Sequence, residues 1–101
     1  MITRVWHGRT ALQNASSYLD FLLNKGTRGY LETRGILSVK VWKRLANDSC
    51  HFYTVTEWEN IEAIKSFAGE NYEKAVYYPE DSGILLEFEE NVTHYETHQV
   101  K

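Results

Sequence analysis

The stretch from Thr54 to Phe67, TVTEWENIEAIKSF, changes its hydrophobic period in the middle, and this change limits what the chain can fold into. β-Branched and aromatic residues lead up to Trp58, which predicts a strand. From Ile61 onward, apolar residues recur at spacings of three and four, which predicts a helix. Asn60 is a favourable N-cap for that helix. We therefore expect a strand and a helix packed on each other, with Trp58 sealing the junction between them.

The same periodicities predict the other elements of the chain. Strands are expected at residues 2–7, at 36–45, from the turn at 46–49 up to Trp58, and at 91–98; helices are expected from an N-cap at Thr10 to the NKG sequence at 24–26, at 61–68, and at 71–78 before Pro79. Residues 84–90 fit either a strand or a connection. The order β-α-β-β-α-β predicts an α+β, ferredoxin-like fold, an antiparallel sheet with both helices on one face.

Apolar residues on both faces of the expected sheet predict a second copy of the chain. In the strand at 36–45, Leu37, Val39 and Val41 share one face, whereas Trp42 lies on the other. The next strand is also apolar on both faces. A monomer with one sheet face in contact with solvent would expose too much apolar surface. A homodimer formed through sheet faces would cover it.

Composition narrows the class of protein further. A chain of 101 residues is expected to form one domain, residues 1–101. Its net charge of −3 argues against a nucleic-acid partner. No apolar run approaches a membrane span, so no membrane partner is expected. The single cysteine, Cys50, and the lack of an opening signal peptide predict a cytoplasmic protein.

At EWENIEAIKSF the sequence resembles the antibiotic biosynthesis monooxygenase family, whose members are small dimeric α+β barrels. The matching residues are Trp58, Asn60, Glu62, Ala63 and Phe67, and the order and length of the elements agree over nearly the whole chain. The opening RVWHGRT and the tail YYPED…LLEFEENVTHYE are similar to an uncharacterised bacterial branch of the family.

The resemblance implies a pocket for a small molecule and cofactor-independent oxygenation of an aromatic or quinol-like compound. A binding or stress-associated protein of the same fold, with no catalysis, is the alternative. A haem-degrading relative is a further alternative. It is disfavoured because Phe67 stands where that branch has a helix tryptophan, Tyr77 or Tyr78 lies near its ligating histidine, and His7 lies near its asparagine. No cofactor is therefore expected.

His7 and His94 are the candidate catalytic bases. The expected topology makes the first and last strands antiparallel neighbours, so the end of the first faces the start of the last. The sequence does not give the register, but this arrangement allows the two histidines to lie within a residue or two of each other. A neutral histidine is a natural proton acceptor for a phenol or quinol near pH 7. The candidate substrate-binding residues are aromatic and belong to the second helical region and the strand before it: Trp58, Phe67, Tyr72, Tyr77 and Tyr78.

No metal site is expected from the histidines. His94 and His98 would lie about 13 Å apart on a strand, which is too far for one ion. His51 is interpreted as isolated, with Cys50 next to it on the opposite face.

Overall fold

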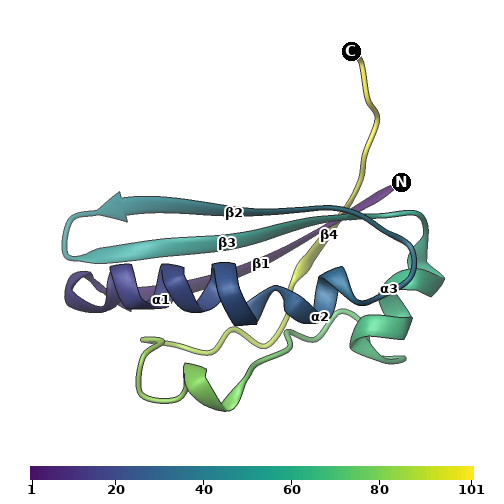
Figure 1. Cartoon of the computed structure of the whole chain (residues 1–101). Coiled ribbons are helices and arrows are strands. Elements are labelled where there is room, and N and C mark those ends of the chain that lie inside the picture. The colour runs from purple at the N-terminus through teal and green to yellow at the C-terminus, as the bar shows by residue number, and fades with distance from the viewer.

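The computed structural model describes all residues, 1–101, and has an antiparallel sheet with helices against one face (Figure 1). The strands are β1 (Ile2–Ala11), β2 (Ile36–Ala46), β3 (Ser49–Trp58) and β4 (Thr93–Glu96), and the helices are α1 (Ala15–Phe21), α2 (Arg28–Leu31) and α3 (Ile61–Ala68). The strand order is β2-β3-β1-β4. The predicted ferredoxin-like α+β fold is confirmed.

Strand β1 is central, and its two faces differ in burial. Its even-numbered residues from Arg4 to Thr10 are buried, whereas the odd-numbered residues are partly exposed. Trp6 pairs with Thr54 of β3, and Gly8 pairs with Phe52, so these side chains share the helix-covered face. The other face, which carries His7, is the open face of the sheet.

Strand β1 extends to Ala11, so the prediction that the strand ends at residue 7 was wrong. Gly8 does not end the strand. A glycine is needed at this position because the Trp6 ring occupies the space that a side chain would take. A Cβ at Gly8 would lie 2.4 Å from a carbon of that ring. Thr10 is consequently a buried strand residue that pairs with Cys50, and not the N-cap of a helix.

The helical layer begins with a 3₁₀ turn at Leu12–Asn14 and continues through α1, a π-helical turn at Leu22–Gly26, and α2. Ala15 and Leu22 are buried in this layer, whereas Leu12 is 46% exposed. The region around Gly29 and Tyr30, for which the sequence predicts neither a helix nor a strand, forms α2.

Residues 69–92, which we call the connecting segment, join α3 to β4 (Figure 1), and Leu85 of this segment forms a bridge to Thr10 at the outer edge of β1. The predicted helix at 71–78 is absent. Its backbone groups bond to the far end of the same segment instead, with Ala75 N–H donating to Glu90 O at 2.9 Å and Val92 N–H to Glu73 O at 2.8 Å. Only Pro79–Asp81 forms a 3₁₀ turn. The last strand is shorter than the predicted 91–98.

The β2–β3 hairpin is confirmed, with one difference at its start. A register shift between Ile36 and Ser38 interrupts the alternation of β2. Leu37 therefore does not share a face with Val39 and Val41 as predicted, and it is 51% exposed.

The junction between β3 and α3 is as the sequence predicts. Trp58 is fully buried against Tyr30, Ala63 and Ile64, and its indole N–H donates to Thr56 Oγ1 at 2.8 Å. The Asn60 side chain accepts a hydrogen bond from Ala63 N–H at 3.0 Å and so caps α3.

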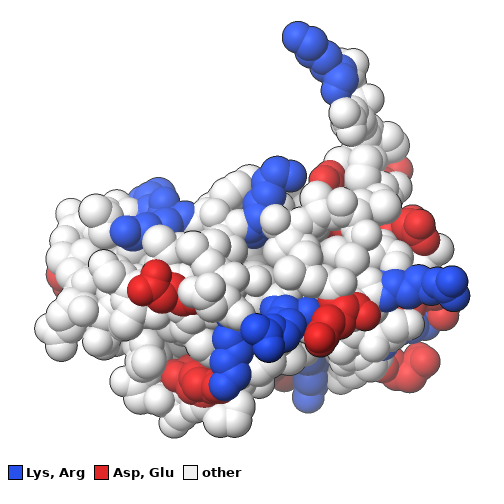
Figure 2. Space-filling view, in the orientation of Figure 1, with Lys and Arg blue, Asp and Glu red and all other residues white.

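On the face shown in Figure 2, Lys and Arg are interspersed with Asp and Glu, without a large patch of one sign. None of the helices combines the length and apolar character that a membrane span needs.

Replacing Asn60 by Ala should lower the free energy of unfolding by about 1 kcal/mol, because one N–H of α3 loses its partner. Urea denaturation followed by circular dichroism measures the change. Asn14→Ala is the matched control, since the Asn14 side chain caps nothing. Equal losses in the two variants would contradict the capping role.

Candidate functional site

A small cavity lies between the sheet, α1, α2 and the connecting segment. Trp6 and Thr54 form its floor, and Val76, Tyr78 and Asp81 close it from the connecting segment. The remaining lining residues come from the helical layer: Tyr18, Phe21, Leu22, Gly26 and Tyr30. Its free volume is about 10 Å³, which is room for about one water molecule.

The Tyr18 hydroxyl donates a 2.7 Å hydrogen bond to Asp81 Oδ1 in this cavity. Both residues are 1% exposed. The second carboxylate oxygen of Asp81 accepts from the backbone N–H of Tyr78 at 2.8 Å. Burial raises the pKa of Tyr18, and the hydrogen bond to Asp81 raises it further. Two donors therefore hold the Asp81 side chain in place, where it can accept a hydrogen bond from a ligand in the cavity.

Two further tyrosines line the same cavity. Tyr30 shares a 3.0 Å hydrogen bond with the Thr54 hydroxyl, and burial is the main cause that raises its pKa. Tyr78 packs edge-on against Phe21, at 6.1 Å between ring centroids, and its pKa is raised by burial and by Asp81. All three tyrosines therefore remain protonated at neutral pH. The single hydroxyl proton of Tyr18 is donated to Asp81, so it becomes available to an oxygen anion only when Asp81 takes up a proton, whereas Tyr78 can donate directly.

His94 lies on the helix-covered face, directly opposite Arg4 of β1. Tyr72 packs edge-on against it, with 5.2 Å between ring centroids. Its Nε2 is buried and has no hydrogen-bond partner. Burial lowers the pKa of His94, and the positive charge of Arg4 lowers it further.

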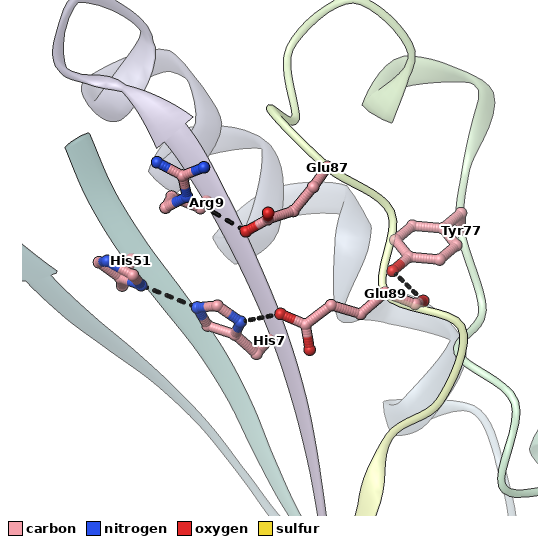
Figure 3. Close-up of polar contacts among 6 residues, drawn as sticks. All are labelled: His7, Arg9, His51, Tyr77, Glu87 and Glu89. Carbon is pink, nitrogen blue, oxygen red and sulfur yellow. Dashed lines mark hydrogen bonds and ion pairs between the residues drawn. The ribbon is translucent and has the colours of Figure 1, made fainter.

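His7 lies on the open face, and the expectation that it meets His94 was wrong. His94 pairs with Arg4, three residues from His7, and an odd separation along a strand places two side chains on opposite faces. His7 instead bonds to Glu89 of the connecting segment and, at 2.8 Å, to Nδ1 of His51 (Figure 3). His51 is therefore not isolated. The structure gathers no group of three metal-ligating residues, and the expected lack of a metal stays a prediction.

Of the five aromatic residues predicted to bind substrate, only Tyr78 lines the cavity. Trp58 is sealed in the core, and Phe67 packs against Tyr30 with 4.6 Å between ring centroids. Tyr77 donates to Glu89 O at 2.6 Å, outside the cavity lining. Tyr72 packs beside His94, outside the cavity lining. The five predicted residues therefore do not form a single site.

Sequence reasoning missed Arg4, Tyr18, Tyr30 and Asp81. A signal for Arg4 was present, because alternation along ITRVW places this arginine inward between Ile2 and Trp6. The Tyr18–Asp81 pair had no such signal, since 63 residues separate its members.

The cavity does not fit a porphyrin. Its volume is about that of one water molecule, whereas pockets for drug-sized ligands measure roughly 300–1,000 Å³. No histidine is among its lining residues.

Stability should fall as the pH drops below about 6.5, the ordinary histidine value, because an unfolded chain takes up a proton that the folded state keeps off His94. His94→Gln should flatten this dependence. Urea denaturation at pH 7.5 and 5.5 measures it, with exposed His98→Gln as the control. An unchanged pH dependence in His94→Gln would contradict the burial argument.

Comparison with known proteins agrees with the fold. No protein-family model matches the sequence, and no curated protein matches it. Among solved structures, a putative antibiotic biosynthesis monooxygenase from Bacillus cereus is similar over 99% of this chain and 97% of its own, with a TM-score of 0.66 and 11% identity. A variant of MhuD with two manganese protoporphyrin IX molecules bound per active site covers 96% and 94%, with a TM-score of 0.59 and 14% identity. The chain therefore has the ferredoxin-like fold of the antibiotic biosynthesis monooxygenases, and the resemblance drawn from its sequence is confirmed at the level of the fold.

Proposed function

We propose that this protein binds a small aromatic or quinol-like compound between its sheet and its connecting segment, and oxygenates it without a cofactor. The observation on which the proposal rests is the cavity described above, which is lined by Tyr18, Tyr30, Tyr78 and Asp81. A phenolic ligand would find aromatic walls, hydroxyl donors and a carboxylate acceptor at one place. The neighbours of the same fold support a small-molecule site, because one is named a monooxygenase and the other holds bound porphyrins.

The proposed reaction needs an anionic substrate. Asp81 accepts the proton of the substrate hydroxyl, as it accepts the hydrogen bond of Tyr18. The protonated tyrosines then donate hydrogen bonds to the resulting anion. The substrate supplies the electrons that reduce dioxygen. One oxygen atom enters the substrate, and the other leaves as water.

Binding requires the cavity to enlarge, since about 10 Å³ holds no organic ligand. The connecting segment is the part proposed to move. It contributes three of the lining residues. Apart from the Tyr18–Asp81 hydrogen bond, its contacts with β1 include the hydrogen bond from Leu86 N–H to Arg9 O at 2.9 Å and surface ion pairs. Opening must expose the buried side chains of Asp81, Leu85 and Val92, but it breaks no helix and no pairing between the long strands β1, β2 and β3.

The second candidate is a non-catalytic binding protein of the same fold. The small free volume favours it, because about 10 Å³ leaves no preformed space for an organic substrate together with dioxygen. Turnover separates the two candidates.

We also propose that the open face of the sheet pairs with a second copy. Trp42, Tyr53 and His7 lie in one row across β2, β3 and β1 on this face, and Trp42 and Tyr95 are each 54% exposed. Such a face is apolar enough to bury in a homodimer.

Light scattering at micromolar concentration should report twice the 11.8 kDa chain mass. Trp42→Glu should shift the protein to monomer, because it places a charge in the paired face. The folded chain does not need Trp42 for its own core, so the variant should keep its circular dichroism spectrum. A wild-type monomer under these conditions would rule out the dimer.

Oxygen uptake with a panel of anthrone- and quinol-type compounds tests the catalytic proposal. Asp81→Asn should slow any turnover on the order of a hundredfold or more, the usual scale for general-base catalysis. His94→Ala and His7→Ala test the bases predicted from sequence, with exposed His98→Ala as the control. Full activity in Asp81→Asn would contradict its role as the base, and loss in His7→Ala alone would move the site to the open face. No uptake with any compound would favour the non-catalytic candidate.

A further inference from the structure

Arg4 is a buried charge without a counter-charge. Its side chain is 1% exposed, yet it forms no ion pair. Its guanidinium donates one hydrogen bond, to Lys74 O at 3.1 Å, and lies 5.5 Å from the centre of the Phe67 ring. The Nε–H is buried and has no partner. Because arginine stays protonated in proteins, an ionised group here is costly unless something balances it.

His94 provides a second unpartnered nitrogen beside the first. It is the register partner of Arg4, so the two side chains leave the sheet on the same face with their Cβ atoms roughly 5 Å apart. The buried Nε2 of His94 bonds to nothing. The two rings of Phe67 and Tyr72 flank the pair, one beside the guanidinium and one beside the imidazole.

Packing alone does not account for this pair. A methionine at position 4 would fill a similar space and would leave no unpaired charge, and such replacements are often stabilising. Native interiors pair nearly all of their buried polar groups with protein or with ordered water, so two orphaned nitrogens on neighbouring residues call for a partner from outside the chain, either a water or a ligand.

We propose that Arg4 and His94 form a subsite for the carboxylate of a small aromatic acid. A carboxylate is planar and has two oxygens, which suits donors projecting from adjacent strands, and its single negative charge balances one guanidinium. A phosphate dianion would leave a second charge buried. The aromatic part of the acid contacts Phe67 and Tyr72. Neither Arg4 nor His94 lines the cavity, but Arg4 lies two residues from the cavity residue Trp6 on the same face of β1. This inference rests on the proposed ligand site between the sheet and the connecting segment, and it assigns the charged end of the ligand to the region beside the cavity, which becomes continuous with it when the segment opens.

Titration of benzoate into the protein at constant ionic strength tests the subsite, with neutral benzamide and inorganic phosphate as comparison ligands. Proton–nitrogen NMR follows the Nε–H signal of Arg4 directly. We expect benzoate to shift this signal saturably and benzamide to leave it in place. Arg4→Met should weaken benzoate binding roughly tenfold or more, the scale of a lost charge-assisted hydrogen bond, and should raise the thermal midpoint of the ligand-free protein.

Arg9→Met is the matched control, because Arg9 lies on the open face and pairs with Glu87 at the surface. It should bind benzoate as the wild type does. Equal benzoate affinity in wild type and Arg4→Met would overturn the subsite, as would tighter binding of phosphate than of benzoate at the Arg4 signal. Benzamide binding as well as benzoate would overturn the carboxylate subsite and leave the proposed ligand site standing. An absence of benzoate binding, together with a lower thermal midpoint in Arg4→Met, would make Arg4 a structural residue.

Discussion

The structure depends on how the long central strand β1 is covered along its outer edge. β4 pairs only with Ile2–Val5, so the rest of that edge needs another element. The connecting segment supplies it through the backbone bond from Leu86 to Arg9, and it reaches over the helical layer to place Asp81 against Tyr18. The cavity, the buried carboxylate and the surroundings of Arg4 all follow from this docking.

The sequence predicted those parts of the fold that local patterns encode. The period change at Trp58 and the cap at Asn60 located β3 and α3, and element order then predicted the sheet. The connecting segment escaped prediction because its backbone bonds join residues far apart in sequence, such as Ala75 and Glu90, and no periodicity reports such contacts. The expected meeting of His7 and His94 failed for a related reason, since strand order does not give register.

The polar groups under the helical layer oppose the stability of the core. Arg4 could be replaced by an apolar side chain at a gain, or at little loss, if packing were its only role. Local rules of protein interiors are most often broken at functional sites. The concentration of these polar groups on one side of the sheet, under a segment that lies outside the regular helices and strands, is what a binding site that opens by local motion would require.

The central claim is that the connecting segment opens while the sheet stays folded. Amide hydrogen exchange, followed residue by residue by NMR, tests it most directly. The account predicts that the N–H groups of Asp81, Leu86 and Val92 exchange through a local opening, well before the amides that pair β1 with β3. Equal protection of both sets, lost together only by global unfolding, would contradict it.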